Sequence, residues 1–144
     1  MVNFNTNKLL KISKSLHKTH HLYLEMRTFH VTFAIYRGKL MSIGINNTKT
    51  HPIIKKLNYC SNDGEDLRNI ARTHSELNCV LKLKNKFPSI YLDDIIFVNI
   101  RLDRMGNVRY SKPCNGCTHL MEQVGYKKIY YSGYCGNFFE LNKR

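Results

Sequence analysis

Two short groups of residues in this 144-residue chain combine metal-binding side chains with one that can carry protons. Residues 74–76 read His-Ser-Glu, and residues 113–117 read Pro-Cys-Asn-Gly-Cys. Zinc prefers nitrogen and sulfur ligands in a tetrahedral arrangement, and a catalytic zinc keeps three protein ligands and one position open for water. We therefore predict that His74, Cys114 and Cys117 bind one zinc ion.

The local setting of both groups is expected to be the start of a helix. Cysteines three residues apart lie on one face of a helical turn, where the helix dipole favours their thiolate forms. Pro113 is predicted at the first helical position, where its missing N–H costs nothing. Two structural alternatives remain open. Thr73 and Glu76 fit a capping box, and a purely structural zinc would need a fourth ligand, for which His119 or Cys79 could serve.

The order of the two groups matches the signature of zinc-dependent deaminases, H-x-E followed by P-C-x-x-C. From residue 29 to the last predicted strand the chain resembles the cytidine deaminase superfamily, with further support from the segments 44–46, 111–117 and 125–132. The resemblance implies an α/β fold with three layers, α-β-α, around a mixed five-stranded sheet that ends in an antiparallel hairpin. It also implies that Glu76, which does not bind the zinc, is the catalytic residue that moves protons between water, base and departing ammonia.

Four further residues are assigned to the substrate through the same resemblance. Asn46 is expected to reach the sugar and base, and Phe29 to lie near the base, although a turn role and core packing are the simpler alternatives. Ser75 replaces the more usual alanine of the motif. The free-cytidine enzymes continue after this asparagine with a glutamate that holds the ribose, and the segment after Asn46 departs from that pattern, so Lys49 or His51 is a candidate phosphate contact instead.

The implied activity is hydrolytic deamination of a cytosine base to uracil in a nucleoside or nucleotide. The alternative is an editing enzyme for single-stranded DNA or RNA, and a third reading is a zinc-stabilised nucleic-acid-binding module without catalysis. Related enzymes are often oligomers, so an assembly of identical chains is expected.

The composition agrees with these expectations without deciding between them. A net charge of +13 and a pI near 9.7 attract phosphate and nucleic acid, yet a lysine-rich solvated surface would have the same charge. With 42% apolar residues and no linker composition, residues 1–144 are predicted to form one domain. The absence of a long apolar run predicts a cytoplasmic protein without membrane contact, and the odd number of cysteines, five, favours metal or thiol roles over disulfides.

The elements that must position the two groups can be read from hydrophobic patterns. Helices are predicted over residues 8–27, 73–87 and 113–124, the last stopped by Gly125. Strands are predicted over 29–36, 40–45, 94–102, 127–132 and 137–141, with an irregular segment at 46–72 and a turn at 103–107. The strand at 94–102 is expected to be central because it is almost continuously apolar, and Cys79 is expected in the core.

Overall fold

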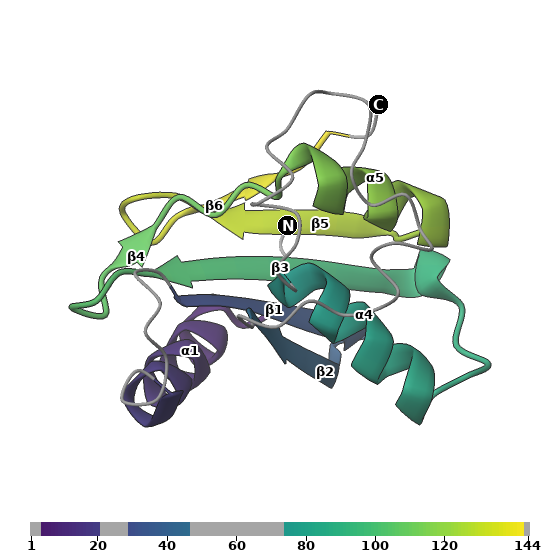
Figure 1. Cartoon of the computed structure of the whole chain (residues 1–144), viewed down its shortest axis with the longest axis horizontal. Helices are drawn as coiled ribbons and strands as arrows, with labels where there is room; N and C mark the ends of the chain where they lie inside the picture. The colour runs from purple at the N-terminus through teal and green to yellow at the C-terminus, as the bar shows by residue number, and fades with distance from the viewer. Residues whose placement is uncertain (1–3, 21–28, 47–73, 143–144) are drawn as a thin grey trace.

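A mixed β-sheet forms the centre of the protein (Figure 1), in a computed structural model that describes residues 4–20, 29–46 and 74–142. Its main path runs in the order β2-β1-β3-β5-β6, and a short strand, β4, pairs with β3. Only β3 and β5 pair in parallel among the described strands. The strands are β1 (Phe29–Tyr36), β2 (Lys39–Ile45), β3 (Ile95–Leu102), β4 (Val108–Arg109), β5 (Lys128–Ser132) and β6 (Phe138–Glu140).

Helices cover both faces of this sheet, as Figure 1 shows. Helix α1 (Thr6–His20) packs on one face, in an apolar cluster that includes Leu9, while α4 (Ser75–Lys86) and α5 (Asn115–Val124) pack on the other. A short 3-10 helix, η1 (Leu92–Asp94), leads into β3. The predicted three-layer α/β fold and its C-terminal antiparallel hairpin are therefore confirmed.

The sheet has one strand more than predicted, because β4 folds back on β3 after the predicted turn. The carboxylate of Asp103 accepts hydrogen bonds from the backbone N–H groups of Met105 and Asn107. It also forms an ion pair with Arg109 at 2.8 Å. These contacts close the turn and hold the two residues of β4 beside β3.

Helix α1 is described as far as His20, and the rest of the predicted segment lies outside the described residues. The starts of the other two helices differ from the sequence expectations. The expectation that Pro113 is the first helical residue is wrong, because Cys114 is the N-cap of α5 and its sulfur accepts the N–H of Cys117. At α4 the N-cap is His74, one residue later than the capping box requires. In the part of the chain that the structure describes, no helix has the length and apolar character to cross a bilayer.

Candidate metal centre and active site

Three side chains converge where helices α4 and α5 begin. His74 Nδ1 lies 3.2 Å from Cys117 Sγ and 3.5 Å from Cys114 Sγ. All three ligand atoms lie within 4.8 Å of one another. The structure therefore brings together the three residues that the sequence predicts as zinc ligands.

The geometry of this group fits a zinc ion. Zinc–sulfur bonds of about 2.3 Å and zinc–nitrogen bonds of about 2.0 Å at tetrahedral angles place ligand atoms roughly 3.5–3.8 Å apart, close to the separations observed. Among the described residues the group contains three ligands and neither His119 nor Cys79, which matches a site with one open position.

The thiol of Cys114 is prepared for metal binding. A hydrogen bond with Cys117, followed by a hydrogen bond and charge attraction from His74, lowers its pKa to about 5, against the opposing effect of burial. It is therefore a thiolate at neutral pH, the form that binds zinc. Cys79 is the opposite case, since complete burial raises the pKa of its thiol to about 12. This cysteine belongs to the core, as predicted.

Glu76 lies beside the metal group and is held from the sheet. Its Oε2 lies 3.4 Å from Cys117 Sγ, and its Oε1 accepts a hydrogen bond of 2.7 Å from Asn99 Nδ2 on β3. The side chain is 5% exposed. Glu76 thus bonds across to the sheet, which differs from the capping-box alternative, in which it would bond back to its own helix start.

A buried polar network fixes this arrangement. Thr32 Oγ1 on β1 lies 2.8 Å from both Ser75 Oγ and Asn99 Oδ1. Asn99 donates from its amide nitrogen to Glu76 and presents its amide oxygen to Thr32. Ser75 is therefore a link between α4 and the sheet, at 2% exposure.

Close packing between α4 and β2 places the start of the helix over these polar residues. A Cβ on Gly44 would overlap the backbone of Ser75 and Cys79, so only glycine permits this approach. On the other side of α4, Leu77 packs with Cys117 and Leu120, which joins the first turns of α4 and α5. Both helix starts are thereby brought to the same end of the sheet.

Asn46 lies at the same end, directly after β2. Its side-chain oxygen accepts a hydrogen bond of 3.0 Å from the backbone N–H of His30, and its own N–H donates to the carbonyl of that residue. The candidate substrate residue therefore also fixes the first residues of β1. Lys49 and His51 lie outside the described residues.

Phe29 lies on the opposite face of the sheet from Glu76. It is 5% exposed, belongs to the apolar cluster beneath α1, and makes an edge-to-face contact with His17. Successive side chains of a strand point to opposite faces, so the residue of β1 on the Glu76 side is the neighbour His30. The structure therefore places Phe29 in the core.

Sequence reasoning missed three polar residues at this end of the sheet: Asn99, His30 and Arg101. Burial is the main reason that the pKa of His30 is lowered to about 4, an effect to which the positive charges of Arg101 and His74 add and which Glu76 opposes. His30 is therefore neutral at pH 7. The sequence signal that could have identified them is a single polar residue inside an otherwise apolar strand. Burying such a side chain costs free energy, so its presence indicates a role.

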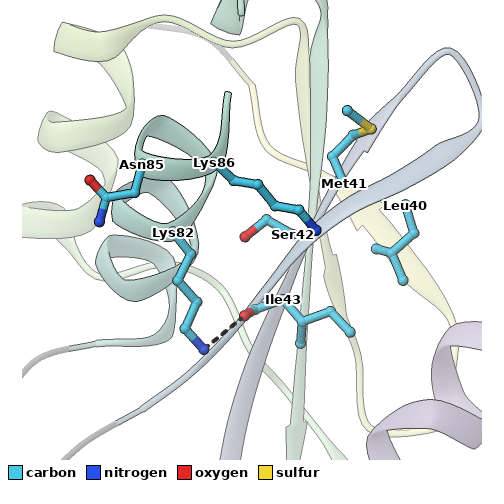
Figure 2. Close-up of a pocket in the computed structure, with 7 residues that line it drawn as sticks. All are labelled: Leu40, Met41, Ser42, Ile43, Lys82, Asn85 and Lys86. Atoms are coloured by element: carbon cyan, nitrogen blue, oxygen red, sulfur yellow. Dashed lines mark hydrogen bonds between the residues drawn. The ribbon is translucent and has the colours of Figure 1, made fainter. Parts of the chain in front are cut away.

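A separate groove of about 630 Å³ lies between β2 and the C-terminal half of α4 (Figure 2). Lys82 reaches across it to the carbonyl of Ile43, with Nζ 3.4 Å from the oxygen. None of the metal-group residues lines it. The lining residues are Leu40, Met41, Ser42, Ile43, Lys82, Asn85 and Lys86.

Comparison with known proteins gives a match in structure and none in sequence. No family model and no curated protein matches the chain. The cytidine deaminase from Mycobacterium leprae aligns with a TM-score of 0.54 at 15% identity, over 94% of this chain and 92% of that one. The dCMP deaminase from the cyanophage S-TIM5 aligns over 88% of this chain and 83% of that one in its apo form (TM-score 0.48, 18% identity). Its complex with dCMP and dUMP gives a TM-score of 0.45 at 19% identity, over 85% of this chain and 82% of that one. The chain thus has a cytidine deaminase-like fold.

Proposed function

We propose that this protein is a zinc-dependent deaminase that converts a cytosine base to uracil in a nucleoside or nucleotide. One observation carries the proposal. A buried carboxylate, Glu76, lies 3.4 Å from a sulfur of a three-ligand metal group while a strand residue holds its other oxygen. A non-ligand carboxylate beside an open metal position is the arrangement that hydrolytic deamination requires.

Each residue has a defined task in this reaction. His74, Cys114 and Cys117 would hold the zinc, which supplies, when bound, a lowered pKa for a coordinated water. Glu76 accepts a proton from the attacking water, delivers a proton to the ring nitrogen of the base, and later protonates the departing amino group. Asn99 holds Oε1, so Oε2 faces the metal group.

The choice of cytosine rests on the motifs and on their resemblance to the cytidine deaminase superfamily, and it agrees with the structural neighbour from Mycobacterium leprae, a cytidine deaminase. Attack of water at the ring carbon that bears the amino group releases ammonia and leaves uracil. Asn46 and Ser75 support the wall of the proposed substrate site, both through hydrogen bonds to β1.

A single-stranded nucleic acid is the second candidate substrate, and an exposed aromatic pair favours it. Tyr110 and Tyr134 are 39% and 67% exposed, and their rings stack at 6.0 Å between centroids and 12° between planes. Tyr110 is close in sequence to the metal group, because it directly precedes the segment that leads to Cys114. Affinity for a strand should fall steeply with added salt, while a pocket for one nucleotide should respond weakly.

Replacing Glu76 by glutamine tests the proposed activity. Ammonia release from cytidine, deoxycytidine, their monophosphates and a cytosine-containing single strand should fall about 10²- to 10⁴-fold with zinc content unchanged. Glu122→Gln, an equal change at an exposed position on α5, is the matched control and should keep full turnover. Full turnover by the Glu76→Gln protein with zinc bound would remove the catalytic assignment. No turnover by the unaltered zinc-loaded protein on any of these compounds would favour a noncatalytic zinc module.

A further inference from the structure

Arg101 carries a buried polar atom that no described residue satisfies. Its Nε has no hydrogen-bond partner among the residues that the structure describes. The nearest acidic residue along the chain, Asp103, is already paired with Arg109 at 2.8 Å. Burying part of a guanidinium without a partner is costly, so a partner other than the described residues is expected to complete it.

The position of Arg101 in the sheet sets it beside the candidate active site. It follows Asn99 by two residues on β3, so both side chains project from the same face, about 7 Å apart along the strand. In the register of the sheet it lies opposite His30, whose backbone is held by Asn46. Asn46, His30 and Arg101 thus form a row across three strands, adjacent to the row of Gly44, Thr32 and Asn99.

The direction of α4 shows which row lies nearer the metal group. Asn78 donates to the carbonyl of Ile45, whereas Lys82 donates to the carbonyl of Ile43, so the helix runs away from Asn46 as its numbers rise. His74, just before the helix, therefore lies toward the row that contains Arg101. Charge interactions of His30 with both His74 and Glu76 agree with this placement.

We propose that Arg101 binds a phosphate group of the substrate. The inference rests on the proposed function and narrows its substrate class to phosphorylated cytosine compounds. The guanidinium offers a planar fork of N–H donors that matches phosphate oxygens. The separation of about 7 Å between Asn99 and Arg101 along β3 allows the base to contact Glu76 while a phosphate contacts Arg101. This phosphate belongs to the same nucleotide or, in a strand, to its neighbour.

The test compares phosphorylated and unphosphorylated substrates in zinc-loaded Arg101→Gln. The ratio of kcat/KM for deoxycytidine monophosphate to that for deoxycytidine should fall about 10- to 100-fold, the effect of one charge-assisted hydrogen-bond pair. Arg101→Lys, which keeps the charge and loses the fork, should give an intermediate ratio. Arg104→Gln removes an equal charge at an exposed turn position and should leave the ratio as it is.

If Arg101→Gln leaves this ratio unchanged and also leaves turnover of a cytosine-containing oligonucleotide unchanged, or loses equally on all of these substrates, the inference is overturned while the proposed function stands. A fall confined to a cytosine-containing oligonucleotide would support Arg101 as a phosphodiester contact in a strand. If the unaltered protein deaminates nothing, the proposed function fails, and calorimetry with uridine monophosphate and uridine decides the inference separately. Tighter binding of the monophosphate that is lost in Arg101→Gln supports it, and equal binding of the two compounds overturns it.

Discussion

The two faces of strand β3 are built from different residues, although one continuous strand forms both. Toward α1 the strand presents only apolar side chains: Ile96, Val98, Ile100 and Leu102, all at most 6% exposed. Toward α4 and α5 it begins with Ile95 and Phe97 and then changes to Asn99 and Arg101. The face toward α1 is apolar and buried, as the core of a protein requires. The second changes to polar residues where the starts of α4 and α5 converge.

The difference shows where stability and function separate in this fold. Buried polar side chains cost free energy unless they are hydrogen-bonded, so a polar end on a central strand needs a reason other than packing. Here the network of Thr32, Ser75 and Asn99 satisfies the polar groups and leads to Glu76. Changes on the α1 face should therefore affect stability, and changes on the α4 face should affect turnover.

Ile100→Ala should have the largest effect on stability. Its side chain is fully buried on the α1 face, and its removal leaves a cavity that costs about 2–5 kcal/mol in free energy of unfolding. Urea unfolding followed by circular dichroism measures this loss. Met105→Ala, at a residue 85% exposed in a turn, should change stability by about 0.5 kcal/mol or less. A large loss of zinc or turnover in the folded Ile100→Ala protein would break the separation between the two faces.

Gly44→Ala should lower stability and turnover together. The added Cβ meets backbone atoms of Ser75 and Cys79, which cannot rotate away, so α4 must shift. Overpacking of this kind costs about 1–3 kcal/mol, and the shift displaces Glu76 from Asn99. Urea unfolding and kcat measure the two losses.

Gly38→Ala is the matched control for this change. Gly38 has a φ of +78° and no atoms within 4 Å of an added Cβ, so alanine there adds backbone strain without moving α4. It should lose stability and keep kcat. Equal kcat in the two glycine variants would show that the close approach of α4 does not position Glu76.

Much of the fold was predictable because its patterns are long. The alternating aromatic and β-branched residues of 29–36, the apolar run at 94–102 and the stop at Gly125 each predicted an element that the structure contains. Strand β4 was not predictable, since it has two residues and depends on the turn contacts of Asp103. The prediction that Pro113 is the first helical residue was wrong because Cys114 is the N-cap of α5. Sulfur is an uncommon N-cap acceptor, so the sequence did not indicate this role.

The candidate site was predictable only where its residues occur in motifs. His74, Glu76 and the two cysteines stand at fixed spacings that few other structures require. Asn99 and Arg101 are single residues in an apolar strand, and their role emerges only when the sheet brings them under α4. A polar residue at alternate positions of a buried strand is the sequence signal that would have found them.

Asn99→Leu should sharpen the comparison most, because it replaces the polar residue of β3 that holds Glu76. Leucine has a similar size, and it replaces a buried amide on the α4 face with the kind of residue found on the α1 face. We expect a loss of about 1–3 kcal/mol in free energy of unfolding, because Glu76 and Thr32 keep their buried polar atoms and lose the amide that bonds them. We also expect kcat to fall about 10- to 100-fold, since Glu76 loses the donor that orients it.

Urea unfolding and ammonia release, measured on the same preparations, separate these two quantities. Asn85→Leu is the matched control, because it makes the same exchange at an exposed residue of the groove beside β2 and should keep kcat. If Asn99→Leu lost several kcal/mol of stability and kept its kcat, the polar end of β3 would serve the fold rather than the reaction. In that case the contrast between the two faces would reflect only how α4 packs on the sheet.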